Sequence, residues 1–466
     1  MQFHTMTFGC QMNVHDAAWL DRALVARGHA RHPVLLGPGE ELSPQVLAGA
    51  DCVILHTCSV REKPEQKVYS LLGRLAAYFR ANPRAFCAVG GCVAQQVGPE
   101  LWRRFPFVRL VFGGDSLPEA PEALERLLAH PRLRISLLDF SESWRPREDH
   151  LEAAPPSPQA FVTIMVGCDN WCSYCIVPSV RGPQRSRPFA DILDECRRLV
   201  DAGAREITLL GQNVNAYGLD LGPGASSFAE LLRAVARLPG LVRLRFTTSH
   251  PKDLDEAVIA AFGEESTLAP MLHLPVQSGS DRVLEAMGRR YTVAHYHKLI
   301  DALRAARPDM AFSTDFIVGF PGETEADFQE TLDLIRQVRY ASAFSFCYTD
   351  RPGTKASAML EKIDPAQSLD RLARLQALQQ EISESRLETF VGHTVEVLLE
   401  GPARRQDTAG LVLTGRDAWN RVVNVHDPEG LIRARQDRSF SGMMVPVRID
   451  AALKHSLAGK AAGATW

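Results

Sequence analysis

Residues 161–175 have the sequence FVTIMVGCDNWCSYC, in which an apolar run leads directly into three closely spaced cysteines. The run Phe161–Val166 is short and apolar, which predicts a buried β-strand. Cys168, Cys172 and Cys175 follow it in a C-x3-C-x2-C pattern. In α/β folds, the loops after the carboxyl ends of parallel strands carry the chemistry. We therefore expect a reactive centre just beyond one strand of a parallel sheet.

These cysteines offer three thiolate ligands within one loop and no fourth. A structural zinc ion normally takes four protein ligands, and iron–sulfur clusters in proteins usually take four thiolates. Three thiolates therefore indicate a metal centre with one coordination position open to a molecule that reacts. The plainer alternative is a zinc knuckle that lacks one ligand, or a chance grouping. The strand that precedes the loop favours the reactive centre.

The overall composition is that of an ordinary globular protein. The chain has 466 residues, enough for two or three domains, with 45% hydrophobic and 23% charged residues. No apolar stretch of about 18 residues suggests a membrane span, and the N-terminus lacks a secretory signal. Ten cysteines are too sparse for a disulfide scaffold, so we expect a cytoplasmic protein with reduced, metal-binding thiols. With a net charge of −3, a nucleic-acid partner would need local basic patches.

Two changes in the sequence pattern divide the chain. The segment 144–159 contains four prolines among charged residues, which indicates a linker. A long helical pattern ends near residues 389–392, and short β-like runs follow it. We therefore predict an N-terminal domain over 1–144, a linker over 145–158, a central domain over 159–388, a third domain over 389–453 and an Ala/Gly-rich tail over 454–466.

The central domain alternates predicted strands with amphipathic helices. A helix predicted over 227–238 begins with a capping box, formed by Ser227 and Glu230, and ends before Pro239-Gly240. Six β–α units imply a parallel sheet with right-handed crossovers, and a partial (β/α)6 barrel fits them. The six predicted strands are 161–166, 206–210, 242–247, 271–274, 312–318 and 344–348.

Polar and glycine-rich segments follow most of these strands, so they would collect at one face of the barrel. The alternative is that loops are polar for ordinary reasons of turn chemistry. Their recurrence after five strands favours a cofactor pocket. The candidates for lining that pocket are Tyr174, Gln212, Asn213, Gln277 and Ser278.

A second set of cysteines, Cys10, Cys58 and Cys92, lies in the N-terminal domain, where each ends an apolar β-like run. In a doubly wound parallel sheet, three such strand ends can converge at the carboxyl edge. We therefore expect these thiols to hold a second metal cluster, again with one open position. The alternative is that they are buried as small apolar residues. We adopt that interpretation for the cysteines that lie inside apolar or helical runs, namely Cys52, Cys87, Cys196 and Cys347.

Four segments together carry a resemblance to a known family. They are residues 7–13 (TFGCQMN), 56–63 (HTCSVREK), 89–96 (VGGCVAQQ) and 167–187. From about Thr5 to Leu453 the chain resembles the radical-SAM methylthiotransferases, where SAM is S-adenosylmethionine. The resemblance implies SAM and two [4Fe–4S] clusters as cofactors. It also implies an N-terminal doubly wound domain, a central radical-SAM barrel and a small C-terminal TRAM-like β-barrel that grips RNA.

The same resemblance assigns roles to the two cysteine sets. The cluster on Cys168, Cys172 and Cys175 would bind SAM and generate a radical from it. The auxiliary cluster, on the set in the N-terminal domain, would present sulfur to the substrate.

Two segments, 61–67 and 415–424, resemble one branch of that family more than the others. This branch methylthiolates carbon 2 of N6-isopentenyladenosine next to the anticodon of tRNA. The implied partners are the tRNA anticodon stem-loop, an external electron donor and a sulfur donor, and we expect a monomer without membrane contact. Residues 417–419 depart from the family, which more usually has polar residues before Asn420, and this weakens the case for RNA contacts by that loop.

Contacts to tRNA phosphates would come from groups of arginines. The third domain has β-like runs at 394–400, 410–414, 421–425 and 443–449, which predict a small barrel of a kind often used for RNA. The candidate groups are Arg103-Arg104, Arg181 with Arg185 and Arg187, Arg289-Arg290 and Arg404-Arg405.

Two alternative functions remain open. A methylthiotransferase acting on threonylcarbamoyladenosine in tRNA, or on a ribosomal protein side chain, would use the same cofactors. A non-catalytic iron–sulfur protein that binds RNA as a redox sensor would need neither a pocket at the barrel face nor a second open cluster. Such a sensor would not cleave SAM.

Overall fold

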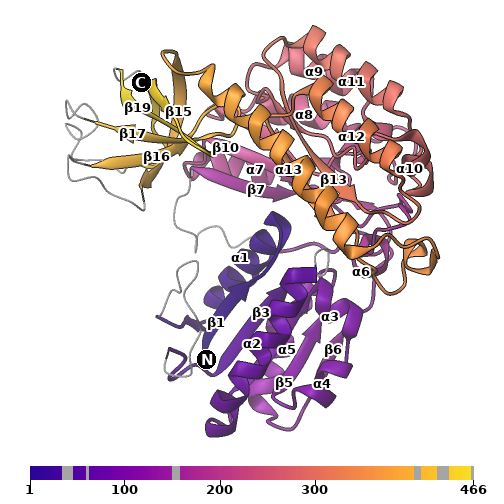
Figure 1. Ribbon diagram of the computed structural model, residues 1–466. Coiled ribbons are helices and arrows are strands. Elements are labelled where there is room, and N and C mark those ends of the chain that lie inside the picture. The colour runs from indigo at the N-terminus through magenta and orange to yellow at the C-terminus, as the bar shows by residue number, and fades with distance from the viewer. Residues whose placement is uncertain (34–45, 59–61, 149–157, 404–410, 428–439, 463–466) are drawn as a thin grey trace.

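The computed structural model describes residues 1–33, 46–58, 62–148, 158–403, 411–427 and 440–462. Figure 1 shows an N-terminal sheet with its helices, a central array of strands flanked by helices, and a small β-barrel reached through the long helix α13 (Pro365–Glu388). In the described ranges, no helix has the length and hydropathy that a membrane span requires.

The N-terminal unit is a six-stranded parallel sheet with the order β2-β1-β3-β4-β5-β6. Alternate residues of its central strands feed two separate apolar cores, with Val53 and Leu55 on one face and Ile54 on the other. This arrangement confirms the predicted doubly wound sheet. The strands are β1 (Gln2–Thr7), β2 (Ala30–Arg31), β3 (Cys52–Thr57), β4 (Phe86–Gly91), β5 (Val108–Phe112) and β6 (Ile135–Leu137). The helices are α1 (Gln11–Ala26), α2 (Glu62–Ala81), α3 (Cys92–Val97), α4 (Glu100–Arg104), η1 (Leu117–Glu119) and α5 (Ala120–Ala129).

The carboxyl ends of β1, β3 and β4 lie side by side, because these three parallel strands are neighbours in the sheet. Each end leads within a few residues into one of the N-terminal cysteines, Cys10, Cys58 or Cys92. Between β3 and β4 the backbone approach is close. Gly91 has φ +89°, and a side chain there would overlap the carbonyl oxygen of Thr57. Only glycine therefore allows β4 to deliver the third cysteine to this edge.

The central unit consists of two three-stranded parallel sheets, β11-β10-β7 and β12-β13-β14. A parallel bridge between Leu244 and Leu268 joins them into one curved array, and the helices lie outside it. The predicted partial (β/α)6 barrel is confirmed, as is the capping box of Ser227 and Glu230. The strands are β7 (Gln159–Thr163), β10 (Glu206–Leu210), β11 (Arg243–Phe246), β12 (Met271–His273), β13 (Ala311–Val318) and β14 (Ser342–Cys347). The helices are α6 (Val177–Arg181), α7 (Phe189–Asp201), η3 (Val214–Ala216), α8 (Phe228–Ala236), η4 (Pro251–Asp253), α9 (Glu256–Glu264), α10 (Asp281–Ala286), α11 (Val293–Ala306), α12 (Glu325–Val338) and η5 (Lys355–Ala358).

The strand predicted over 161–166 is two strands in the structure. β7 stays in the barrel up to Thr163, and β8 (Met165–Val166) then pairs antiparallel with β9 (Arg185–Ser186). An apolar run predicts a strand without revealing which neighbour it pairs with, so this change of partner could not be predicted. The pairing of β8 with β9 takes the chain out of the barrel sheet immediately before the three cysteines, which lie between these two strands.

The C-terminal unit is a closed barrel with the strand order β15-β16-β17-β19-β18, which confirms the predicted small barrel. The prediction of a tail over 454–466 was wrong in part, because β19 pairs with both β17 and β18 and closes the barrel. Arg404 and Arg405, most of the predicted linker (149–157) and the last residues (463–466) lie outside the described residues. The strands are β15 (Thr394–Pro402), β16 (Val412–Arg416), β17 (Val422–His426), β18 (Met444–Ala452) and β19 (Leu457–Ala461).

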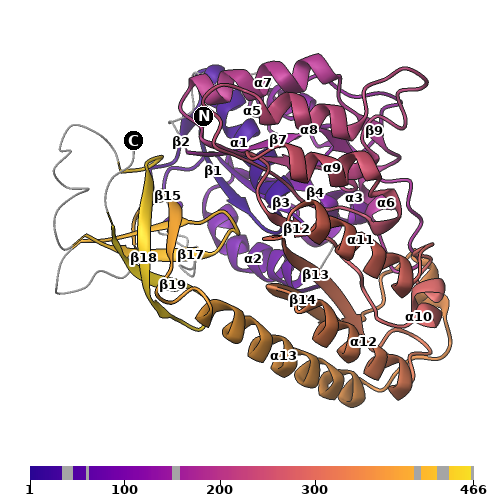
Figure 2. The same ribbon diagram turned by 90° about the horizontal axis from the view of Figure 1, so that it is seen from above.

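Buried arginines fasten this barrel to the central unit. Arg243 donates to the carbonyl oxygens of Arg416 (2.7 Å) and Glu396 (2.8 Å), and Arg245 donates to those of residues 417 and 418. The indole of Trp419 donates to the carbonyl of Asp309 at 2.8 Å. The loop that departs from the family sequence therefore packs on the central unit. Figure 2 shows α13 running along the edge of the central unit into the barrel.

Candidate active site

The loop with Cys168, Cys172 and Cys175 lies between β8 and α6 at the carboxyl end of the barrel. Its backbone is held at two points from outside, where the amide of Cys168 donates to Gly182 O (3.2 Å) and that of Ser173 to Met287 O (2.9 Å). A turn within the loop adds a third bond, from the amide of Cys175 to Cys172 O (3.0 Å). Cys168 and Cys172 are buried and Cys175 is partly exposed. The structure thus places all three predicted ligands on one well-fixed loop.

A buried cation accompanies these thiols. Arg289 is 4% exposed, and its Nη1 lies 3.5 Å from Cys172 Sγ and 3.4 Å from the hydroxyl of Tyr174. Its other donors reach the carbonyl of Pro275 (2.8 Å) and the hydroxyl of Tyr291 (3.1 Å). Within the described part of the chain, no carboxylate forms an ion pair with Arg289. A buried charge is costly without a counter-charge, and a cluster bound by three thiolates would supply one. The surroundings therefore fit an anionic cluster.

Two of these thiols, Cys168 and Cys175, favour the protonated form in the absence of metal. Burial raises the pKa of Cys168 to about 11. Burial, assisted by the neighbouring Cys172, raises the pKa of Cys175 to about 12. Metal ligation requires thiolates, so loading of this loop would displace protons.

The second cysteine set surrounds Asn13 on the first turn of α1. The Asn13 side-chain nitrogen donates at 2.8 Å to the carbonyls of both Phe8 and Thr57, which precede Cys10 and Cys58. A hydrogen bond with Cys58 is the main cause that lowers the pKa of Cys10 to about 5, and the charge of Arg181 adds to it against the opposing effect of burial. A thiolate is thus favoured here, as a metal ligand requires.

The two cysteine sets meet through one helix. α6 begins two residues after Cys175, and its N-cap residue Ile176 and its Val180 pack with Cys92 of α3 in a small apolar cluster. Among the described residues, no three His, Cys, Asp or Glu side chains gather as the ligands of a single metal ion would. Each thiolate on a four-iron cube binds its own iron atom, so the ligands of such a cluster are spread around a larger object than one ion.

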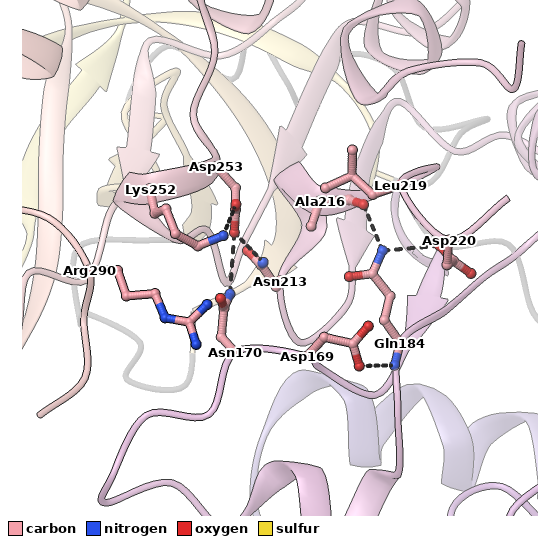
Figure 3. Close-up of a pocket in the computed structure, with 10 residues that line it drawn as sticks. All are labelled: Asp169, Asn170, Gln184, Asn213, Ala216, Leu219, Asp220, Lys252, Asp253 and Arg290. Atoms are coloured by element: carbon pink, nitrogen blue, oxygen red, sulfur yellow. Dashed lines mark hydrogen bonds and ion pairs between the residues drawn. The ribbon is translucent and has the colours of Figure 1, made fainter. Parts of the chain in front are cut away.

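A polar cavity of about 160 Å³ opens beside the first cysteine loop (Figure 3). On one side Asp253 accepts hydrogen bonds from Asn213 (2.7 Å) and Asn170 (3.2 Å), with Lys252 and Arg290 close by. On the other side lie Asp169, Gln184 and Asp220. Of the five predicted pocket residues, only Asn213 lines this cavity. Gln184 and Arg290 were missed because neither directly follows a barrel strand.

The other predicted pocket residues support the loops. The Gln212 side-chain oxygen accepts from the amide of Gly167 at 2.6 Å and so holds the start of the cysteine loop. Tyr174 packs on an apolar cluster that includes Met287 and Phe320. Gln277 is buried, and its backbone bridges to β13. Ser278 is 0% exposed and lies 3.4 Å from Thr331 Oγ1, so in this structure it shapes the turn after β12.

Three buried polar atoms near the strand ends have no partner in the described structure: Asn213 Oδ1, Ser249 Oγ and His250 Nε2. They come from the loops after β10 and β11. Burial, together with the charge of Arg289, lowers the pKa of His250 to about 2, so its imidazole is neutral. Unpartnered buried polar atoms are rare in folded proteins, and here they suit a polar cofactor. The sequence predicted polar segments after most of the barrel strands but not these individual side chains.

The prediction that Arg181, Arg185 and Arg187 contact tRNA phosphates was wrong for the structure. Arg181 is 4% exposed and pairs with Asp16, Arg185 is 3% exposed and pairs with Asp115, and the mostly buried Arg187 pairs with Glu195. Arg289 is buried beside Cys172. The exposed candidates are Arg103, which pairs with Glu100, Arg104, whose guanidinium lies over the ring of Tyr69, and Arg290 at the cavity.

A three-cysteine loop at the carboxyl end of a partial parallel barrel, next to a polar cavity, defines a protein of the radical SAM class. The Radical SAM superfamily matches residues 162–335, and the uncharacterized protein family UPF0004 matches residues 2–113.

Relatives that align over the full length identify the family within this class, and they carry the name tRNA-2-methylthio-N(6)-dimethylallyladenosine synthase. The protein from Nitratidesulfovibrio vulgaris is 52% identical over 464 residues, covering 100% of this chain and 99% of the relative. The protein from Oleidesulfovibrio alaskensis is 49% identical (99% and 98% covered), and that from Lawsonia intracellularis is 48% identical (98% and 97% covered). The chain therefore belongs to the family of the tRNA-2-methylthio-N(6)-dimethylallyladenosine synthases.

Solved structures support the fold. The radical S-adenosylmethionine methyltransferase TsrM from Kitasatospora setae aligns with a TM-score of 0.56 at 16% identity, covering 76% of this chain and 77% of TsrM. The cobalamin-dependent S-adenosylmethionine radical enzyme OxsB aligns with a TM-score of 0.50 at 12% identity, covering 81% and 56%. At such low identity the likeness concerns architecture alone.

Proposed function

We propose that this chain transfers a methylthio group to carbon 2 of N6-isopentenyladenosine (N6-dimethylallyladenosine) in tRNA, with SAM and two [4Fe–4S] clusters as cofactors. The observation that carries this proposal is that two sets of three cysteines, one in the N-terminal unit and one in the central unit, are connected by the packing of α3 against α6. Membership of the synthase family supports the choice of substrate.

The substrate position explains why such cofactors are needed. Carbon 2 of an adenine is neither acidic nor electrophilic enough for ordinary acid–base catalysis, so its hydrogen has to be removed by other means. When bound, SAM and the two clusters supply the radical chemistry that removes this hydrogen and the sulfur that replaces it. A protein with only one open cluster would lack a separate place from which to deliver sulfur.

The residues of the central unit would hold the radical-generating cofactors. Cys168, Cys172 and Cys175 would bind one cluster, and Arg289 would balance its charge. We retain Asn213 for direct contact with SAM, because its buried Oδ1 has no partner in the described structure. Gln212, Tyr174, Gln277 and Ser278 would act by shaping the loops around the cofactor.

The residues of the N-terminal unit would hold the second cluster and fix its position. Cys10, Cys58 and Cys92 would be its ligands, leaving one iron for sulfur. Asp16 accepts hydrogen bonds from Arg147 (2.8 Å) and from Arg181 (3.1 Å), which come from the linker region and from α6. This buried ion pair links the two units, so it would keep the two cluster sites at a constant separation.

The C-terminal barrel would bind the tRNA. Small barrels are common RNA-binding modules, and sequence-specific RNA recognition favours unstacked loop bases such as those of an anticodon loop. The contacts of Arg243 and Arg245 fasten the barrel rigidly to the central unit, so tRNA held by the barrel would be presented at a defined place. We also propose a monomeric, cytoplasmic protein that receives electrons and sulfur from separate donors.

The test is an analysis of tRNA nucleosides from a strain that lacks this gene. The proposal predicts that the 2-methylthio derivative disappears while N6-isopentenyladenosine accumulates, and that the wild-type gene restores the derivative. A gene carrying Cys172→Ala should not restore it. Retention of the 2-methylthio mark in the deletion strain would contradict the proposal. Loss of methylthio groups from threonylcarbamoyladenosine or from a ribosomal protein instead would assign a different acceptor.

A further inference from the structure

Arg181 carries positive charge from the central unit into the cysteine set of the N-terminal unit. It is the last residue of α6, the helix that begins two residues after Cys175. Its side chain is 4% exposed, and it donates to Asp16 Oδ2 at 3.1 Å and to Asn13 Oδ1 at 2.9 Å, both on α1. A side chain at Gly114 would overlap its guanidinium, so the N-terminal unit leaves room for this one group.

Asn13 connects this guanidinium to two of the three cysteines. Its side-chain nitrogen ties together the carbonyls of Phe8 and Thr57, just before Cys10 and Cys58. Its oxygen is thereby turned toward Arg181 and accepts from it. Arg181 also lies close enough to Cys92 and Cys10 for electrostatic interaction with both sulfurs. The guanidinium therefore lies near these two cysteines, and Asn13 connects it to the backbone just before Cys58.

Among the described side chains, the carboxylate of Asp16 does not by itself balance the local positive charge. Asp16 is fully buried and carries one negative charge, but two guanidinium groups share it, because Arg147 donates to its Oδ1 while Arg181 donates to its Oδ2. Asp16 therefore balances one of the two guanidinium charges, and the cysteine sulfurs near Arg181 would balance the other as thiolates. A buried cation is stabilised by an anion, and three thiolates on an iron–sulfur cluster provide one.

We propose that Arg181 is a positioning residue for the cluster held by Cys10, Cys58 and Cys92, and that its charge raises the reduction potential of that cluster. The inference rests on the proposed function, since it assumes a cluster at this set. Reduction adds negative charge to the cluster, and a nearby cation stabilises the reduced form more than the oxidised form. Because Arg181 comes from the central unit, on the helix that follows the loop of the other cluster, the second site is complete only when the two units are docked.

Arg185 provides a matched control. It is 3% exposed, lies on the same stretch of chain and also crosses between the units, where it pairs with Asp115 at 2.7 Å and donates to the carbonyl of Ser141 at 2.8 Å. Its charged partner is thus Asp115 and not Asp16, and its bond to Arg181 goes to the backbone carbonyl (3.0 Å) and not to the guanidinium. Replacing Arg185 disturbs the docking of the units without removing the cation that faces the cysteines.

The experiment uses full-length protein with Cys168, Cys172 and Cys175 replaced by alanine, so that only the N-terminal set can hold a cluster. Anaerobic redox titration followed by electron paramagnetic resonance gives the potential of that cluster. Relative to this background, Arg181→Gln should raise the oxidised-to-reduced ratio at a fixed potential at least tenfold, which is about 59 mV for one electron. Arg181→Lys keeps the charge, and Arg185→Gln keeps Arg181, so both should stay within about twofold of the background, well below that tenfold step.

An unchanged potential in Arg181→Gln, or an equal shift in Arg185→Gln, would overturn the inference. If Arg181→Gln binds no iron, Arg181→Lys decides: retention of the cluster supports the role of the charge, and its loss contradicts it. Absence of any cluster in the background protein would instead contradict the proposed function, so the two failures are distinguishable.

Discussion

The substitution Gly167→Ala should remove the radical-generating cluster and spare the other. Gly167 has φ +77°, and a Cβ there would lie 1.8 Å from the carbonyl oxygen of Pro183, whereas real Cβ contacts do not fall below 3.0 Å. The left-handed backbone costs an alanine about 1–2 kcal/mol. In addition, the turn at residues 182–183 has to move by about 1.2 Å, the difference between those two distances. That turn accepts the hydrogen bond from the amide of Cys168, so the cysteine loop moves with it.

The expected result is a fall in SAM cleavage of about 100-fold or more, since a displacement near 1 Å can cost that much in a positioned reaction. Iron content should drop from about eight to about four per chain. Gly203→Ala is the control, because Gly203 has φ +106° and no atom of the described residues lies within 4 Å of its Cβ position, so it carries the backbone cost without the overlap. The assay is deoxyadenosine formation by anaerobically reconstituted, reduced protein. A Gly167→Ala protein with full iron and SAM cleavage within about twofold of wild type would refute this account of the loop.

Other substitutions separate the remaining claims. Cys172→Ala should abolish deoxyadenosine formation and keep the auxiliary cluster, whereas Cys58→Ala should still cleave SAM but yield no methylthio product. Chromatography of nucleosides and deoxyadenosine checks both results. The reverse pattern would contradict the assignment of the two cysteine sets. Arg371→Ala breaks an ion pair with Glu323 in which both side chains are 1% exposed, which should cost about 3–5 kcal/mol of unfolding free energy. Arg374→Ala removes an exposed pair on the same helix and should cost about 0–1 kcal/mol; equal losses in urea denaturation would show that burial is not what matters.

Much of the fold could be predicted because its signals are local. The strands of the central unit are apolar runs with helices between them, and the capping box at Ser227 is a three-residue pattern. The strand β19 was missed because its sequence, LAGKA, has no β-branched or aromatic residue. Its place is decided by the pairing with β17 and β18, which closes an otherwise open barrel edge. Barrel closure depends on the other strands as well, so the five residues of β19 do not indicate it by themselves.

The candidate site could be predicted from the sequence only in part. The six cysteines stand out because each follows a strand-like run, and parallel strands bring their carboxyl ends to one edge. The arginines were misplaced because their partners are distant in sequence: Asp16 is 165 residues from Arg181, and Asp115 is 70 residues from Arg185. From the sequence alone, a basic residue on a loop is expected to contact solvent or phosphate. Its buried carboxylate partner becomes known only from the structure. The orientation of the Ser278 side chain likewise depends on Thr331, which lies far along the chain on α12.

The most direct test of the account is Mössbauer spectroscopy, with iron and sulfide counts, on full-length protein reconstituted under anaerobic conditions. The account predicts about eight irons and about eight sulfides per chain, in two [4Fe–4S] clusters of which the Cys168/Cys172/Cys175→Ala protein keeps one. A single cluster in the wild-type protein, or zinc bound at either cysteine set, would contradict it.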